Sequence, residues 1–167
     1  MKRLTEKRIL NITLFYLSRY ESSASKVRAM LYRRLRKMQL RGEEIPSEAP
    51  QWIDNAITTA EKNAYLNDER YAATQVRHWI EQGKSERYMM AKLEQAGIDP
   101  NVGHRLLTES GSTDQERARR FLKRKHLGPY RPTADQARYR TKDLAALARA
   151  GFSYDVAQSA LQADTEI

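Results

Sequence analysis

The chain has 167 residues, 40% of them hydrophobic and 31% charged, a composition that allows a hydrophobic core of modest size. It contains no cysteine, which excludes disulfides and thiolate metal sites, and no apolar run approaches the roughly 18 residues that a membrane span needs. Thirty Lys and Arg against 21 Asp and Glu give a formal charge of +9, and the positive field of such a chain attracts polyanions, nucleic acid first among them.

Helical periodicity runs through almost the whole sequence, and no segment alternates apolar and polar residues as a half-buried strand would. The fold class is therefore predicted to be all-α. Helices are expected, in chain order, at about residues 5–19, 25–38, 51–63, 68–82, 85–96, 100–110, 114–125, 134–149 and 153–162. One Gly and two Pro interrupt the pattern between residues 39 and 50, which predicts a loop there.

A short string occurs twice in the second half of the chain. LEQAGIDPNV at residues 93–102 returns as LARAGFSYDV at residues 147–156, with Leu, Ala, Gly and Val at matching places and an offset of 54 residues. Each copy encodes the end of one helix, a glycine that reverses the chain, and an Asp or Ser that caps the next helix. The recurrence predicts a repeated helix–turn–helix corner.

The expected helices divide into three sets of three, over residues 4–64, 67–110 and 113–163. Only the second and third sets contain the repeated string, so the first set is assigned by its helix count. Short helices that do not bury an apolar face alone stack on their neighbours. The predicted architecture is therefore three tandem three-helix repeats stacked into an elongated, curved rod.

Basic residues cluster in each of the three sets. On the second helix, an apolar stripe through Val27 and Leu31 leaves a basic front on the opposite side. The stretch RARRFLKRK at residues 117–125 has six Lys or Arg among nine residues, several of them on one helix face. Such a face suits phosphate groups or a carboxylate-rich protein groove, although a merely solvated helix surface has the same pattern. The candidate partner-binding residues are Lys26, Arg33, Arg36, Lys37, Lys84, Arg87, Arg120, Lys123, Arg124, Arg140 and Lys142.

The signatures of common enzymes are missing from the sequence. It has no phosphate-binding loop, no HExxH metal motif, no GxSxG nucleophile motif and no dinucleotide fingerprint. The histidines His78, His104 and His126 fall on different expected helices, which favours solvated side chains over a metal site. No enzymatic activity, no metal and no cofactor are predicted.

Five stretches, spread in order over about residues 8 to 162, carry a resemblance to a known family. They are RYESSASKVRAMLYRRL, YLNDERYAATQV, AKLEQAGID, RRFLKRKHLGPYRP and RTKDLAALARAGFSYDV. With these stretches the chain resembles the RecX family, bacterial regulatory proteins that bind the RecA recombinase. Two places differ from the family pattern. EQGKSERYMMAKL has Met89 and Met90 where RecX proteins often have basic residues, and the loop over residues 39–50 is longer than in many relatives.

The resemblance implies the same three-repeat fold and a non-enzymatic role in recombination, DNA repair and the SOS response. RecX proteins lie in the groove of the RecA filament on single-stranded DNA and restrain filament growth, ATP hydrolysis, strand exchange and co-protease activity. By this resemblance, the chain is expected to be a cytoplasmic, monomeric negative regulator whose partner is the RecA filament. DNA, single- or double-stranded, is a second candidate partner, and no membrane contact is expected.

Two other functions fit the same residues. A helical module that binds DNA or RNA directly would use the same cations, and its affinity would fall steeply with salt concentration. A helical adaptor for another acidic protein would use them equally well. An enzyme is the least favoured alternative.

Overall fold

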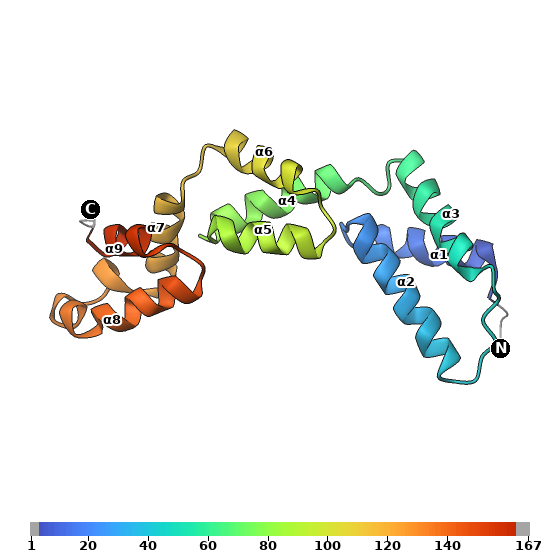
Figure 1. Cartoon of the computed structure of the whole chain (residues 1–167), viewed down its shortest axis with the longest axis horizontal. Coiled ribbons are helices and arrows are strands. Elements are labelled where there is room, and N and C mark those ends of the chain that lie inside the picture. Colours follow the sequence, from blue (N-terminus) through green and yellow to red (C-terminus); the bar gives the residue numbers. More distant parts are fainter. Residues whose placement is uncertain (1–3, 163–167) are drawn as a thin grey trace. The chain divides into compact units, whose positions relative to one another are not determined.

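The computed structural model describes residues 4–162, and this range contains nine α-helices, one 3-10 helix and no strand (Figure 1). The all-α prediction is confirmed. The α-helices are α1 (Glu6–Leu17), α2 (Ala24–Gln39), α3 (Ala49–Lys62), α4 (Asp68–Glu81), α5 (Glu86–Gln95), α6 (Pro100–Ser110), α7 (Asp114–Lys125), α8 (Thr133–Arg149) and α9 (Tyr154–Gln162). Periodicity did not predict the short 3-10 helix η1 (Gly128–Tyr130). None of the helices in this range is both long and apolar enough to cross a membrane.

Short polar side chains set several of the helix starts, as the sequence predicts. Asp99 caps α6, because its carboxylate accepts the backbone N–H of Asn101 at 2.8 Å, and Pro100 occupies the first turn, where no N–H is needed. Thr113 and Glu116 form a capping box at the start of α7. These caps satisfy backbone groups that a helix end otherwise leaves unpaired, so they fix the helix boundaries locally.

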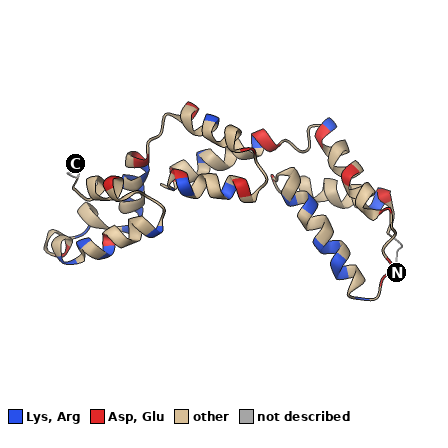
Figure 2. Ribbon diagram, in the orientation of Figure 1, with Lys and Arg blue, Asp and Glu red and all other residues tan. Residues whose placement is uncertain are grey.

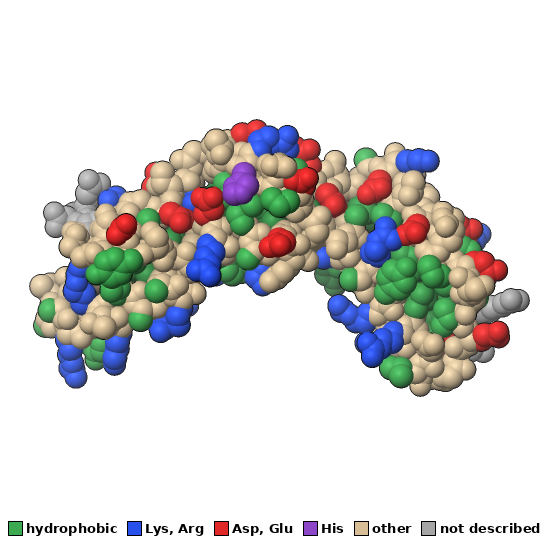
Figure 3. Space-filling view, viewed as in Figure 1, with side chains coloured by type: hydrophobic (Ala, Val, Ile, Leu, Met, Phe, Trp, Pro, Cys, Tyr) green, Lys and Arg blue, Asp and Glu red, His purple; other side chains and the backbone are tan. Residues whose placement is uncertain are grey.

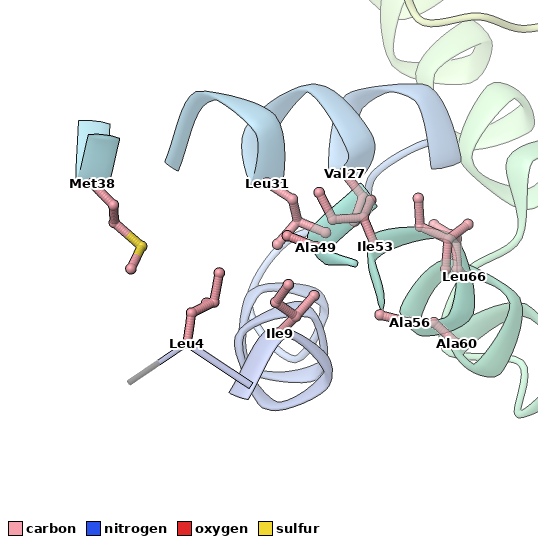
Figure 4. Close-up of a cluster of buried hydrophobic side chains, with 11 residues drawn as sticks. Leu4, Ile9, Val27, Leu31, Met38, Ala49, Ile53, Ala56, Ala60 and Leu66 are labelled. Carbon is pink, nitrogen blue, oxygen red and sulfur yellow. The ribbon is translucent and has the colours of Figure 1, made fainter. Parts of the chain in front are cut away.

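The chain divides into two compact units. Of the described residues, 4–72 and 96–98 form the first unit, and 73–95 and 99–162 form the second. In the first unit, the apolar faces of α1, α2 and α3 meet in one core (Figure 4). The buried side chains of this core are Leu4, Ile9, Val27, Leu31, Met38, Ala49, Ile53, Ala56, Ile57, Ala60 and Leu66. The alanines of α3 let the neighbouring helices approach closely.

In the second unit, α7, α8 and α9 surround a separate core. Its buried side chains are Ala118, Leu122, Leu147, Phe152, Ala157, Ala160 and Leu161. In the same unit, α5 packs against α6, and the inward side chains of α5 are Met89 and Leu93. Trp79 and Tyr88 meet edge to face, with ring centres 5.9 Å apart. Met89, which stands where the family pattern is often basic, is therefore a packing residue.

The first and third predicted sets of helices each surround a core of their own. The boundaries of the three sets and the rod that they would form stay predictions. Residue 163, the predicted end of the third set, lies outside the described residues.

The repeated string makes the same hydrogen bond in both of its copies. In the first unit, the hydroxyl of Ser23 donates to the backbone carbonyl of Ala96 at 2.6 Å. In the second unit, the hydroxyl of Ser85 donates to the carbonyl of Ala150 at 2.7 Å. Both alanines directly precede the glycine of the string. Both serines are buried at the start of a helix, α2 or α5, and also accept a backbone N–H of its first turn.

A second hydrogen bond accompanies the first at each corner. The carboxylate of Asp68 accepts the backbone N–H of Ala24 at 2.7 Å, and the carboxylate of Asp114 accepts that of Glu86 at 2.9 Å. Asp68 and Asp114 are the first residues of α4 and α7, and Ala24 and Glu86 directly follow the two serines. The string therefore recurs because each copy completes the same arrangement of helix ends.

The glycine in each copy of the string leaves no room for a side chain. Gly97 and Gly151 have φ angles of 73° and 94°, a region that other residues rarely adopt. A Cβ on Gly97 would lie 2.5 Å from the Cβ of Ser25, and a Cβ on Gly151 would lie 2.6 Å from the hydroxyl oxygen of Ser85. Backbone geometry and close approach both require glycine at these positions.

We expect replacement of either corner serine by alanine to destabilise the unit that contains it. In Ser23→Ala and Ser85→Ala a carbonyl loses its donor and a helix loses its cap, so each change should lower the free energy of unfolding by about 2 kcal/mol. Urea unfolding followed by circular dichroism measures the change. The control is Ser18→Ala, because Ser18 is exposed and its hydroxyl donates only to the carbonyl of Phe15 at the end of its own helix. Equal losses in all three variants would contradict the role of the corners.

Candidate basic binding surface

Helix α2 presents a continuous cationic face in the first unit. Its other side buries Val27 and Leu31 in the core, so helical periodicity turns the basic side to solvent. Arg33, Arg36 and Lys37, all predicted as partner-binding, are exposed there, and blue marks the C-terminal half of this helix in Figure 2. None of the three side chains has a hydrogen bond or ion pair with another described residue, so their charges are available to a partner.

Lys26, at the start of the same helix, is engaged within the first unit. Its ammonium donates to the hydroxyl of Tyr71 at 2.5 Å and lies 5.0 Å from the centre of the Tyr71 ring. Tyr71 is buried, so Lys26 supplies a partner for a hydroxyl that would otherwise lose its hydrogen bond to water. A substitution of Lys26 would therefore change packing as well as surface charge.

A cavity of about 250 Å³ opens at the C-terminal end of α2. The residues that line it are Arg8, Arg34, Lys37, Met38, Arg41 and Glu43. Four of them are cationic and one is a carboxylate, so the cavity is electropositive. Of these residues only Lys37 was predicted as partner-binding.

Helix α7 carries three predicted contact residues, and two of them are engaged within the second unit. The guanidinium of Arg120 donates to the carbonyl of Ile80 at 3.1 Å, and that of Arg124 donates to the carbonyl of Gln82 at 3.1 Å. Both carbonyls lie at the end of α4, where backbone acceptors lack helical partners. The side chain of Lys123 is exposed and, within residues 4–162, has no hydrogen bond or ion pair. Lys123 is therefore the predicted contact residue of α7 whose side chain does not support the fold.

Lys84 and Arg87 lie on either side of the corner serine Ser85. The ammonium of Lys84 is 5.0 Å from the centre of the Tyr88 ring, a cation–π contact that holds it against the start of α5. Arg87 is exposed in the first turn of the same helix. The two predicted residues of this segment therefore differ, because the side chain of Lys84 contacts a ring whereas that of Arg87 has no such contact.

Helix α8 gathers cations around one aromatic ring. The guanidinium groups of Arg131 and Arg138 lie 4.7 and 5.4 Å from the centre of the Tyr139 ring, and the ammonium of Lys142 lies 5.3 Å from it. Arg140 is exposed on the same helix. Lys and Arg side chains project from one edge of the region that holds α7 to α9 (Figure 3). This region of the second unit therefore presents positive charge to solvent.

A buried ion pair supports the cations of α8. Asp143 is 1% exposed and accepts two hydrogen bonds from the guanidinium of Arg131 and one from the backbone N–H of Gly128, each at 2.8 Å. Burial by itself raises the pKa of the Asp143 carboxyl, but the hydrogen bonds from Arg131 and Gly128 and the adjacent positive charge together leave that pKa below its ordinary value. The pair ties η1 to α8 and fixes Arg131 over Tyr139.

The structure places the predicted residues in separate groups: α2 in the first unit, and the start of α5, α7 and α8 in the second. Sequence reasoning missed further cations that complete these groups, namely Arg8, Arg34, Arg41, Arg131 and Arg138. The spacing of Arg34 and Lys37 along one helix side, with Arg41 four residues further on, was a usable signal. Nothing local in the sequence brings Arg8 to the same cavity, because that contact depends on the packing of α1 against α2.

The histidines lie on separate elements: His78 on α4, His104 on α6, and His126 directly after the end of α7. In the part of the chain that the structure describes, no group of three or more His, Asp or Glu is placed to hold a metal ion. The ring of His104 lies 3.8 Å from the carboxylate of Glu86, and the ring of His78 lies 2.6 Å from the side-chain amide of Gln82. Both contacts involve exposed side chains.

Known proteins similar to this chain are regulatory proteins named RecX. One from Myxococcus xanthus is 32% identical over 158 residues, which cover 92% of this chain and 84% of that protein. Another from Agrobacterium fabrum is 29% identical over 133 residues, which cover 79% of this chain and 71% of that protein. The crystal structure of RecX from Lactobacillus salivarius matches with a TM-score of 0.61 and 21% identity over 94% of both chains. A second crystal structure of a regulatory protein RecX matches equally well over 92% of this chain and 70% of that one. No protein-family model matches the chain.

We expect Asp143→Asn to lower the free energy of unfolding by about 3 kcal/mol near neutral pH, because Arg131 loses its buried counter-charge. The pKa of Asp143 is lower in the folded than in the unfolded state, so its contribution is complete above about pH 4 and is lost as the pH falls through the folded-state pKa. Urea unfolding at a series of pH values measures both effects. The difference in free energy of unfolding between the wild type and Asp143→Asn should disappear in acid. A difference that stays unchanged there would contradict the role of the ion pair. Asp155→Asn, at an exposed position of α9, is the control and should have little effect.

Proposed function

Because this chain belongs to the RecX family of regulatory proteins, we propose that it is a negative regulator of the RecA recombinase that binds in the groove of the RecA filament on single-stranded DNA. The family is one of regulatory proteins and not of enzymes. The observation that supports the proposal is the set of solvent-facing cations on α2 in the first unit and on α5, α7 and α8 in the second. Cations held on helices of two units allow contacts at more than one place on a long polymeric partner.

Regulation of this kind requires that the protein occupy the groove of the filament, and it requires no covalent chemistry. A chain that contacts neighbouring RecA subunits at the same time opposes the movements that accompany ATP turnover and subunit exchange. Many modest contacts on one chain give a strong overall attachment, because each further contact is made within a complex already formed. Filament growth, ATP hydrolysis, strand exchange and co-protease activity all fall as a result, with the protein acting as a monomer in the cytoplasm.

The proposed contact residues differ in what else they do. Those whose side chains face solvent without a hydrogen bond or ring contact among the described residues are Arg33, Arg36, Lys37, Arg87, Lys123 and Arg140. Those that also hold the fold together are Lys26, Lys84, Arg120, Arg124 and Lys142. Substitutions in the first group test partner binding without disturbing a structural contact.

We expect the double variant Lys123→Glu and Arg140→Glu to be a weaker inhibitor of RecA than the wild type. Two reversed charges on the contact surface turn attraction into repulsion, so the protein concentration for half-maximal inhibition should rise about 10-fold, which corresponds to about 1.4 kcal/mol of binding free energy. The measurement is the ATPase activity of RecA on single-stranded DNA with this protein titrated in. Circular dichroism should show unchanged helix content.

A control with the same change in net charge is Lys7→Glu with Lys62→Glu. Both lysines are exposed on α1 and α3 and are not among the proposed contacts. This variant should inhibit RecA within about twofold of the wild type, because its reversed charges lie outside the contact surface. If the two double variants lose inhibition equally, net charge alone is responsible and the assigned contacts are wrong.

The same titration separates the proposal from its main alternative. A module whose primary target is nucleic acid would bind naked DNA tightly and leave the ATPase of RecA unchanged. Absence of inhibition by the wild-type protein, together with tight binding to DNA alone, would contradict a role in RecA regulation.

A further inference from the structure

The electropositive cavity of the first unit is built from two helices and the turn after α2. Arg34 and Lys37 lie three residues apart on one side of the end of α2, and Arg41 follows in the turn. Arg8 reaches the same cavity from α1. Basic residues at a helix C-terminus are common because they interact favourably with the helix dipole. The dipole does not account for a further cation contributed by another helix.

The turn after α2 contributes two residues, Arg41 and Glu43, to the lining of this cavity. The backbone N–H of Gly42 donates to the carbonyl of Gln39 at 3.0 Å, and that of Glu43 donates to the carbonyl of Met38 at 3.1 Å. This pair of bonds is the Schellman arrangement, which reverses the chain tightly at a helix end. The turn therefore holds Arg41 beside the last residues of α2 and adds Glu43, the single carboxylate of the lining.

The charges of the cavity favour a phosphate ligand. Without Arg8, the lining still has three cations against one carboxylate around about 250 Å³, an excess of two positive charges. Like charges that line one cavity repel one another, and an anion bound between them relieves the repulsion. The planar guanidinium of arginine donates two parallel hydrogen bonds to phosphate oxygens, which makes three arginines a suitable lining for this group.

We propose that the cavity binds one phosphate of a nucleic-acid backbone, so that the first unit contacts DNA directly. The surroundings on α2 favour a nucleic acid over free phosphate. Arg33 and Arg36 are exposed on the same helix and provide further contacts for neighbouring phosphates. Tyr32, 42% exposed, precedes Arg36 by one helical turn and offers an aromatic face to a base. This contact goes beyond the regulatory function proposed above and does not rest on it.

The test measures binding of a fluorescent single-stranded oligonucleotide by anisotropy, without RecA, over a series of NaCl concentrations. The test variant is Arg34→Gln with Arg41→Gln. Each phosphate contact on a single strand contributes about 0.7 to the slope of log affinity against log salt, so loss of two cationic contacts should reduce the slope by about 1.4. The conservative pair Arg34→Lys with Arg41→Lys keeps the charges and should recover most of the wild-type slope.

A matched control removes two charges elsewhere in the same unit. Lys7→Gln with Lys62→Gln has the same change in net charge, and Lys7 lines a different surface, shared between α1 and α3. This control should keep the wild-type slope to within about 0.3. Circular dichroism and thermal unfolding of every variant exclude loss of folding as the cause of a change.

Three results would overturn the proposal. One is an equal fall in slope for the test variant and the control, which would mean that DNA responds to net charge alone. Another concerns inorganic phosphate, measured by calorimetry. If the wild type binds it and the test variant does not, while both have the same oligonucleotide slope, the cavity is a site for the free ion. The last is an unchanged slope with loss of RecA inhibition, which would assign the cavity to a protein contact. Because the anisotropy assay contains no RecA, its outcome is independent of the regulatory function.

Discussion

Two serine hydroxyls, on Ser23 and Ser85, connect the ends of helices that are far apart in the sequence. Each hydroxyl accepts a backbone N–H at the start of a helix and donates to a carbonyl at the end of another. Both kinds of group are left without partners by the helices themselves, so one side chain satisfies two otherwise unpaired positions. The glycine after each carbonyl approaches the same segment closely, which leaves no room for a larger residue on either side.

Cationic side chains also serve the fold of this protein, which limits how much of its charge is available to a partner. Arg120 and Arg124 bind carbonyls at the end of α4, and Arg131 is paired with a buried carboxylate. The long aliphatic parts of such side chains cover apolar surface while their charged ends reach acceptors or water. The formal charge of +9 therefore overstates the free positive surface. Lys123 and Arg140, whose side chains are exposed and make no hydrogen bond, ion pair or ring contact within the described residues, remain the stronger candidates for partner contacts.

Membership of the RecX family and the distribution of free cations lead to the same kind of function, in which the protein acts by occupying a surface. The cavity at the end of α2 adds a local site to this general attraction. Its cations come from two helices and a fixed turn, so it has a defined shape, whereas an exposed basic helix has only a charged face. A phosphate contact there would give the first unit a contact to DNA that is separate from the RecA contact proposed for it.

The sequence by itself determined the helices and most of their ends, because helical periodicity, capping residues and reversal glycines act over a few neighbouring positions. It also identified a repeated corner from the string that ends in Val102 and Val156. Only the tertiary structure decided what that corner binds, since the Ser23 hydroxyl lies 73 residues before its acceptor and no local pattern links the two. In the same way, the sequence listed the cations, but packing decided which of them support the fold, which face solvent and which converge on one cavity. Contacts of this kind depend on how helices meet, and that geometry is set by cores whose members are scattered along the chain.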